Sequence, residues 1–154
     1  MKKLITIFIF TVLFAFVQNA KAQSYASAAG VRFGKWMFGG TYKKMIKDGI
    51  YLDLHAGFLS SVSDILVFGG NLEIHKELEG VDGLYYFYGG GARAFTGSGI
   101  FSIEVTGVLG LDYKFEEIPV NVSIDWMPGY YFSDYSGFTA EGGGVSIRYV
   151  LSEN

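Results

Sequence analysis

The sequence predicts an all-β protein: an eight-stranded antiparallel up-and-down transmembrane β-barrel that follows a cleaved signal peptide. Three observations lead to this fold. Apolar and polar residues alternate with the two-residue period of a β-strand along most of the chain after residue 22. The polar face of this pattern carries full charges in the middle of the strands. Glycine (22 residues) and aromatic residues (18%) are abundant and proline (2 residues) is rare, a mixture that barrels with aromatic girdles use.

A basic head, an apolar run and a small-x-small motif stand at the amino terminus. The head is Met1–Lys3, the run is Leu4–Val17 and the motif is Ala20–Ala22. The run is too short for a membrane-spanning helix, which needs about 20 apolar residues. We therefore expect a signal peptide at residues 1–22 and a single barrel domain at residues 23–154. An uncleaved anchor is the alternative.

The composition indicates where in the cell the protein is expected and which partners it can bind. The chain has no cysteine, so no disulfide stabilises it and no lipid-bearing cysteine follows the signal peptide. The formal net charge of −3 includes Lys2, Lys3 and Lys21, and removing these three positive charges leaves −6. Such an acidic chain offers no basic surface for nucleic acid. We expect an outer-membrane location, lipid as the main contact, no cofactor, and a monomer, because a closed barrel has no edge strand.

The clearest hairpin combines two runs, Phe101–Phe115 and Pro119–Trp126. In the first run the odd positions are mostly apolar, while the even positions include Glu104 and Asp112. The same alternation returns in the second run, where Asp125 lies on the polar face. A strand with one uninterrupted apolar face and one charged face is typical of a wall with lipid outside and a wet interior.

The same alternation between turn signals predicts eight strands. They are Ala26–Gly34, Met37–Ile46, Ile50–Leu59, Ile65–Lys76, Leu84–Phe95, Phe101–Phe115, Pro119–Tyr131 and Thr139–Leu151. Most reach the roughly 9–11 residues that a tilted membrane-spanning strand needs. An even number of strands returns both termini to one side, expected to be periplasmic. The external loops are then residues 35–36, 60–64, 96–99 and 133–137, all of them short.

Assigning each strand's inward face by its polar half places ten charged side chains in the lumen. They are Arg32, Lys43, Asp53, Glu73, Arg93, Glu104, Asp112, Lys114, Asp125 and Arg148. Five are positive and five are negative. An eight-stranded barrel is only wide enough for side chains to fill, so we expect a lumen closed by paired charges that stabilise the wall. A narrow or gated polar path is the alternative.

His55 and His75 also fall on inward positions, each two residues after a carboxylate, Asp53 or Glu73. This spacing would let a carboxylate orient a histidine for acid–base catalysis. However, two histidines without a third ligand make a poor metal site, and no serine in a nucleophile-elbow context stands near either one. We therefore predict no catalytic residue and no metal site.

Aromatic residues gather at both ends of the predicted strands. Those at the external ends are Trp36, Trp126, Tyr130, Tyr131, Phe132 and Tyr135, and those near the periplasmic ends are Tyr113, Phe115 and Tyr149. They predict two belts at the level of the lipid headgroups. Pro128 cannot donate to a strand ladder and is expected at a bulge or strand end near the rim. Glycine clusters such as Gly142–Gly144 are expected inside strands, where they make room for large neighbours.

Several segments resemble a known group of proteins. Gly110–Pro128, Val145–Leu151, Asn71–Leu78 and Tyr86–Ala92 are similar to strands of the small outer-membrane β-barrel proteins common in Bacteroidota, of the OmpA-like or PorT-like type. The resemblance covers nearly all of the chain after the signal peptide. The resemblance implies a β-barrel fold, an outer-membrane location, and the barrel-assembly machinery as a partner during insertion. It implies no catalytic residues. The closing strand of such proteins often ends on an aromatic residue, which is leucine here, at position 151.

Three functions compete at this point. The first is a non-enzymatic integral outer-membrane protein with a structural role or limited passage of small solutes. The second is an outer-membrane enzyme that modifies lipids, which would need a serine, histidine and acid group near the outer leaflet. The third is a soluble periplasmic ligand-binding barrel of lipocalin type, which would need an apolar interior and a polar outside. The charged face of the strands favours the first function.

Overall fold

A computed structural model describes residues 25–133 and 136–153 of the chain. These residues form ten strands: β1 (Tyr25–Gly34), β2 (Phe38–Lys47), β3 (Ile50–Leu59), β4 (Val62–Glu77), β5 (Leu84–Gly97), β6 (Ile100–Lys114), β7 (Val120–Trp126), β8 (Gly129–Phe132), β9 (Gly137–Thr139) and β10 (Gly143–Glu153). The signal peptide predicted at residues 1–22 lies outside the described residues. Within them, no helix is long and apolar enough to span a membrane.

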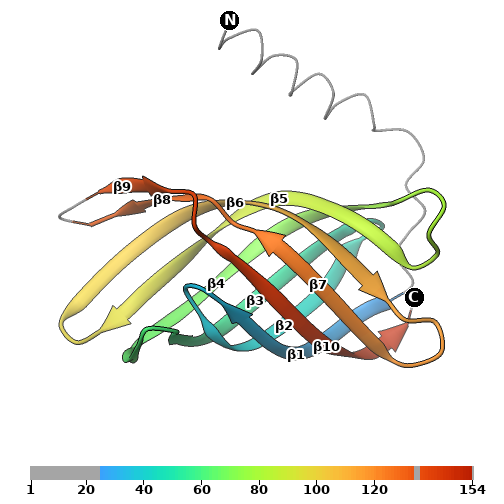
Figure 1. Ribbon diagram of the computed structural model, residues 1–154, viewed down its shortest axis with the longest axis horizontal. Coiled ribbons are helices and arrows are strands. Elements are labelled where there is room, and N and C mark those ends of the chain that lie inside the picture. Colours follow the sequence, from blue (N-terminus) through green and yellow to red (C-terminus); the bar gives the residue numbers. More distant parts are fainter. Residues whose placement is uncertain (1–24, 134–135, 154) are drawn as a thin grey trace, which may run out of the picture.

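The strands close into a barrel. Each strand from β1 to β6 pairs antiparallel with the next one along the chain. β6 then pairs with β7 and β8, β7 pairs with β10, and β10 pairs back with β1. Because β8 continues the line of β7, and β9 and β10 share the last position, the wall has eight strands (Figure 1). The predicted all-β, closed, eight-stranded antiparallel architecture is confirmed.

The register of the strands determines which residues face inward. Along β5 and β6 it runs unbroken from Leu84 opposite Tyr113 to Gly97 opposite Ile100. Because side chains alternate between the two faces of a strand, a slip of one residue would move every charge of a strand to the outside. The burial pattern follows this alternation, since buried and exposed residues take turns along β6 from Ile103 onward.

The seventh and eighth strands are interrupted, whereas the sequence predicted each as continuous. Met127 and Pro128 separate β7 from β8, so Pro128 lies at a break between strands as predicted, but the break is opposite Gly107 in the middle of β6 and not near the rim, where it was expected. Residues 140–142 separate β9 from β10. Gly142 therefore lies in a break, where its carbonyl accepts a hydrogen bond from the Met127 N–H (3.0 Å). Gly143 follows with φ of 138°, a conformation that favours glycine.

The two ends of the barrel differ. The start of β1 and the end of β10 lie at the same end as the β2–β3, β4–β5 and β6–β7 connections (Figure 1). We call this the terminal end and the opposite one the mouth. The β1–β2, β3–β4, β5–β6 and β8–β9 connections lie at the mouth. The β3–β4 turn is shorter than predicted, because β4 begins at Val62.

Candidate functional site

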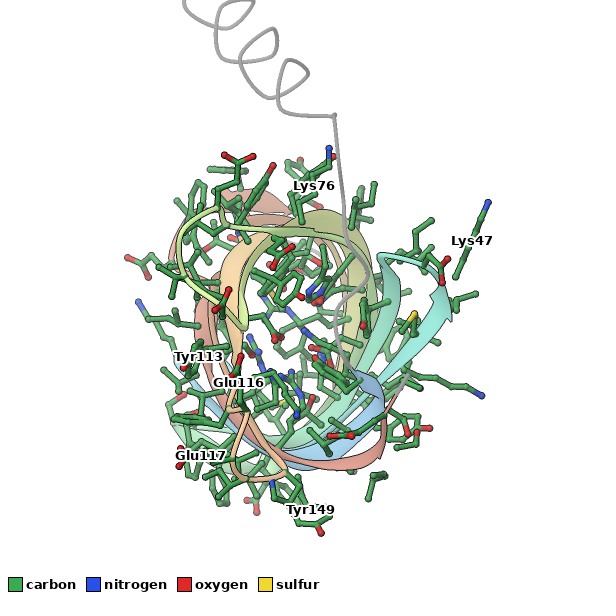
Figure 2. The ribbon with its side chains drawn as sticks, turned by 90° about the vertical axis from the view of Figure 1, so that its right-hand side faces the viewer. Lys47, Lys76, Tyr113, Glu116, Glu117 and Tyr149 are labelled. Carbon is green, nitrogen blue, oxygen red and sulfur yellow. The ribbon has the colours of Figure 1, made fainter. Side chains whose placement is uncertain are left out.

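The interior of the barrel holds all ten charged side chains that the sequence placed in the lumen. Nine of the ten residues are buried, with exposed fractions of 6% or less, and the side chain of the tenth, Asp125, is 3% exposed. Figure 2 looks into the terminal end and shows nitrogen and oxygen atoms filling the ring of strands, while Lys47 and Tyr149 point away from it. The alternation of the strands brings these ten residues together, and the pairing among them depends on the closed wall.

Lys43 is the centre of the main charge cluster. Its Nζ atom lies 2.7 Å from Glu73 Oε2, 3.2 Å from Asp112 Oδ2 and 3.8 Å from Asp53 Oδ2. In the eight-stranded wall, β2 and β6 stand opposite each other, so the contact from Lys43 to Asp112 spans the interior. The ammonium group also lies 4.5 Å from the centre of the Phe87 ring. One cation on β2 thus contacts carboxylates of three other strands, β3, β4 and β6.

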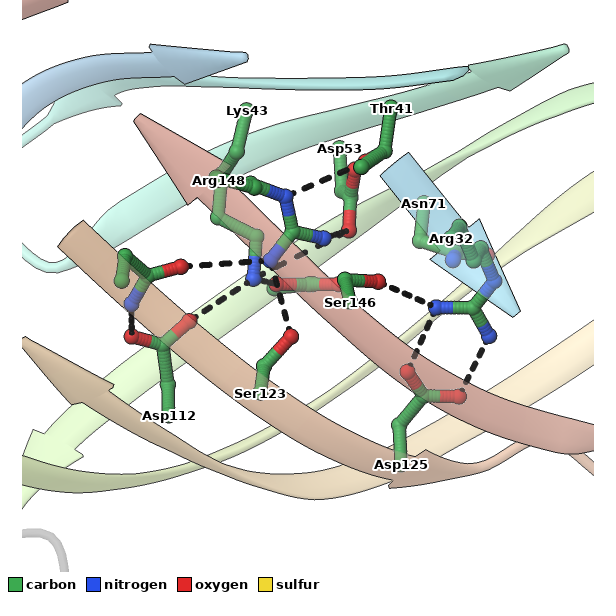
Figure 3. Close-up of polar contacts among 12 residues, drawn as sticks. Arg32, Thr41, Lys43, Asp53, Asn71, Asp112, Ser123, Asp125, Ser146 and Arg148 are labelled. Atoms are coloured by element: carbon green, nitrogen blue, oxygen red, sulfur yellow. Dashed lines mark hydrogen bonds and ion pairs between the residues drawn. The ribbon is translucent and has the colours of Figure 1, made fainter. Parts of the chain in front are cut away.

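Arg148 forms the second hub of this cluster. Its Nη2 atom donates to Asp53 Oδ2 at 2.7 Å, its Nη1 atom to Ser123 Oγ at 2.8 Å and its Nε atom to Thr41 Oγ1 at 3.1 Å (Figure 3). The Thr41 hydroxyl in turn donates to Asp53 Oδ1 at 2.8 Å. A buried guanidinium is stable when its donors find such acceptors. Arg148 therefore links β10 to β2, β3 and β7.

Arg32 and Asp125 form a separate pair closer to the mouth. The guanidinium binds the carboxylate through two hydrogen bonds of 2.6 and 2.7 Å, the two-pronged geometry that arginine and carboxylate favour. A third hydrogen bond of 3.2 Å goes to Ser146 Oγ. This pair joins β1 to β7 beneath the mouth. Figure 3 shows it beside the main charge cluster around Lys43 and Arg148.

Arg93 and Glu104 form the lumen ion pair that borders the mouth cavity, which Glu104 lines. Arg93 Nε donates to Glu104 Oε2 at 2.8 Å, with both side chains buried. The other atoms of this pair, Arg93 Nη2 and Glu104 Oε1, have no hydrogen-bond partner among the described residues. Gly129 makes room for the carboxylate, because a Cβ at this position would lie 2.2 Å from Glu104 Oε1.

The two histidines lie inside the barrel but differ in their contacts. His75 Nε2 lies 2.9 Å from Glu73 Oε2, and its ring stacks on Phe87 with centroids 4.9 Å apart. The ring nitrogens of His55 have no hydrogen-bond partner within the described part of the chain. Of the two carboxylate–histidine pairs that the sequence raised, only Glu73–His75 is formed. Residues 25–133 and 136–153 contain no group of three or more His, Cys, Asp or Glu residues that could hold a metal ion.

Aromatic side chains close the terminal end of the interior. The rings of Tyr25 and Tyr51 lie 5.4 Å apart, and the Tyr51 hydroxyl donates to the Tyr25 carbonyl at 2.8 Å. The Tyr25 hydroxyl donates to Asp112 at 3.3 Å and so connects this layer to the charge cluster. Lys114 pairs at 3.1 Å with Glu153, a residue that the sequence analysis did not place in the lumen. Glu153 is exposed, which makes this pair part of the rim.

A cavity of about 720 Å³ opens at the mouth, and sequence reasoning missed it. Its lining is mainly apolar and aromatic. The lining residues are Trp36, Leu59, Ile65, Phe95, Ile100, Ser102, Glu104, Tyr131, Phe138, Thr139, Ala140 and Glu141. These residues come from the β1–β2 connection, from strands β3, β4, β5, β6, β8 and β9, and from the break between β9 and β10. No local motif could reveal the cavity, because only the closed barrel brings these segments together.

The outer face of the wall is apolar and exposed. Along the middle of the strands it presents residues such as Leu72, Val105 and Ile124, which are 54–56% exposed. Of the predicted belt residues, Phe115, Trp126, Tyr130, Phe132 and Tyr149 are exposed. Two others instead line the mouth cavity: Tyr131, which takes the inward position of β8 between exposed Tyr130 and Phe132, and Trp36 of the β1–β2 connection. Tyr135 lies outside the described residues.

Comparison of the chain with known protein families, with curated proteins and with solved structures found no match. The resemblance to small Bacteroidota barrels thus stays a prediction from the sequence.

Proposed function

We propose that this chain is an integral outer-membrane protein without enzymatic activity, whose eight strands cross the bilayer and whose lumen is closed by paired charges. One observation carries the proposal: the wall exposes apolar side chains outward and buries charged side chains inward. Exposed apolar surface of this extent is unfavourable in water and favourable in lipid. Membrane-spanning barrels have this arrangement of an apolar outer band around a polar interior.

A soluble ligand-binding barrel would have the opposite arrangement. Such a barrel needs an apolar cavity in its middle and a polar outer surface. Here the middle of the barrel contains Lys43, Asp53, Asp112 and Arg148, all buried. The outward positions on the same strands are mostly apolar, for example Leu54, which is 43% exposed. The two faces therefore favour the membrane over a soluble periplasmic location.

The contacts across the lumen favour a structural role or limited passage of small solutes. Lys43 and Asp112 meet from opposite sides of the wall, and Arg148 contacts side chains of three other strands. Such contacts fill a small barrel rather than leaving an open channel. Among the described strands, the closed wall leaves an unpaired edge at the three-residue strand β9, and such a short edge offers little for pairing with a second copy, which favours a monomer held by outer-membrane lipid. Insertion by the barrel-assembly machinery belongs to the same proposal.

A lipid-modifying enzyme is the alternative that the histidines raise. A reaction on lipid headgroups would place the histidine and its carboxylate near the mouth, at the outer leaflet. The Glu73–His75 pair lies beside Lys43 and stacks on Phe87 inside the barrel, with His75 1% exposed. A lipid headgroup would have to displace this packing to reach the imidazole. This position favours the structural role of the pair.

A pair of matched substitutions tests the membrane proposal. Val105→Arg places a charge on the outer face of β6, and Val81→Arg places the same charge in the β4–β5 connection outside the wall. Both valines are exposed, at 54% and 47%. In a bilayer, Val105→Arg should destabilise the folded barrel by about 2–4 kcal/mol if this position lies near the midplane. Val81→Arg should have little effect.

The readout is the fraction of protein that migrates as a compact, heat-modifiable band after extraction of the outer membrane. We expect this band for the unchanged chain and for Val81→Arg, and a loss of it for Val105→Arg. If the two variants gave the same fraction of heat-modifiable protein, and the protein were found in the soluble periplasmic fraction, the proposal would be contradicted. Conductance of the inserted barrel in a planar bilayer separately tests the closed lumen, for which we expect no open-pore current.

A further inference from the structure

The side chains that line the interior near the mouth differ in polarity from those deeper in the barrel. Deeper in the barrel the inward side chains are largely charged and paired, whereas the mouth cavity is lined mainly by apolar and aromatic groups such as Trp36, Phe95 and Tyr131. Its volume of about 720 Å³ falls within the range of pockets that hold small organic ligands, roughly 300–1,000 Å³. Apolar walls of this kind contribute affinity for an apolar ligand body.

Buried polar atoms without partners among the described residues belong to two lining residues of this cavity, Glu104 and Trp36, and to Arg93, which is bound to Glu104. Arg93 and Glu104 bind each other through one hydrogen bond, which leaves Glu104 Oε1 as a free acceptor and Arg93 Nη2 as a free donor among the described residues. The indole Nε1–H of Trp36 is a third buried polar group without a partner there. Glu104 lines the cavity, and Arg93 lies under Phe95, with its guanidinium carbon 5.8 Å from the ring centre.

Buried polar atoms are nearly always hydrogen-bonded, so free ones on the lining residues Glu104 and Trp36, and on Arg93 next to Glu104, indicate a ligand that supplies the missing bonds. Glu104 Oε1 requires a donor, and Arg93 Nη2 and Trp36 Nε1 require an acceptor. The Arg93–Glu104 pair is neutral as a whole, and the Lys35–Glu141 pair at the rim is also neutral. A charged head group would therefore meet no net compensating charge.

We propose that the mouth cavity binds an apolar small molecule with an uncharged head group that both donates and accepts hydrogen bonds, of the class of medium-chain primary amides and alcohols. The head group would donate to Glu104 and accept from Arg93, while the apolar body would lie against the aromatic walls. This site goes beyond the proposed membrane role and does not depend on it, because the cavity and its polar atoms belong to the barrel itself.

Three probes with the same chain length test the head-group chemistry. Octanamide donates and accepts, N,N-dimethyloctanamide only accepts, and octanoate is charged. The folded full chain is held in an amphipathic polymer, which avoids competition from detergent monomers, and tryptophan emission reports binding through Trp36. We expect a saturable change with octanamide and an affinity lower by about tenfold or more for the other two probes, because each leaves an unsatisfied group or an uncompensated charge. No saturable change with octanamide, or equal affinity for all three probes, would overturn the proposal.

Two variants locate the site. Ser102→Phe adds bulk to an inward position of the cavity wall and should abolish octanamide binding, whereas Ser152→Phe at the terminal end should leave it unchanged. Glu104→Gln preserves the size of the side chain but leaves Arg93 with a net positive charge, so the preference should shift from octanamide toward octanoate. A heat-modifiable band verifies that each variant is folded. Unchanged binding in Ser102→Phe, or a Glu104→Gln barrel that is folded yet keeps the original preference or loses both ligands, would overturn the assignment.

Discussion

Arg148 of β10 and Asp53 of β3 form an ion pair of 2.7 Å inside the barrel, although 95 residues separate them along the chain. Two strands, β1 and β2, stand between them in the wall, so the side chains meet across the interior. Both side chains are almost fully buried, at 0% and 4% exposure. This pair connects the last strand to the first half of the chain and strengthens the closure of the wall.

Replacing Arg148 should therefore cause a large loss of stability. Arg148→Met keeps much of the side-chain volume and removes the positive charge, so that Lys43, at 3.8 Å, is the one ion-pair partner left to Asp53 within the described part of the chain. Removal of one member of a buried ion pair typically costs about 3–5 kcal/mol. Urea unfolding in lipid vesicles, followed by the heat-modifiable band, measures the difference. The double variant with Asp53→Asn should lose less than the sum of the two single variants, and strict additivity would contradict the coupling.

Two adjacent lysines give a matched test of the inward charge cluster. Lys43 is buried and contacts Glu73, Asp112 and Asp53, whereas Lys44 is exposed on the outer face of the same strand. Lys43→Met should destabilise the barrel by about 3–5 kcal/mol, because three carboxylates lose their shared cation. Lys44→Met should change the stability by less than about 1 kcal/mol, or raise it slightly in a bilayer. Equal effects in the same unfolding assay would show that Lys43 does not organise the interior.

Glycines of β6 test how tightly the interior is filled. A Cβ at Gly110 would lie 2.5 Å from Phe87 Cζ and 2.4 Å from the Ile124 carbonyl oxygen, whereas a Cβ at Gly107 would have no contact closer than 3.9 Å. Gly110→Ala should therefore destabilise the barrel by about 1–3 kcal/mol through overpacking. Gly107→Ala should leave the stability unchanged or raise it by up to about 1 kcal/mol, because the unfolded chain loses freedom. Chemical denaturation curves of the two variants, compared at equal lipid composition, distinguish these outcomes.

The sequence predicted the strands well because their alternation is a local property. The bounds of β3, Ile50–Leu59, match the prediction, and most other strands differ by one to three residues at their ends. The breaks in the last two strands were only partly predictable. Pro128 indicates one, since it lacks an N–H, but Gly142 resembles the other glycines that lie inside strands.

The pairing of the lumen charges could not be predicted in the same way. Alternation shows that Lys43 and Asp112 both face inward, but the closure of the wall determines that they stand opposite each other. The mouth cavity depends even more on closure, because Trp36, in the β1–β2 connection, and Phe138, in β9, are far apart along the chain. An aromatic residue near a strand end has the same sequence signal whether it points into a belt or into the mouth.

A buried and an exposed ion pair of the same barrel should respond differently to loss of a carboxylate charge. Arg32 binds Asp125 through two hydrogen bonds, with both side chains 4% exposed or less, whereas Lys35 and Glu141 pair at the rim with 54% and 66% exposure. Asp125→Asn leaves a buried guanidinium without its counter-charge and should destabilise the barrel by about 3–5 kcal/mol. Glu141→Gln breaks a pair that water already screens, so its effect should stay below about 1 kcal/mol. Raising the salt concentration should weaken only the rim pair. Stability curves of both variants at low and high salt therefore test whether the lumen charges are shielded from water, and a salt-sensitive Asp125→Asn defect would indicate an interior open to solvent.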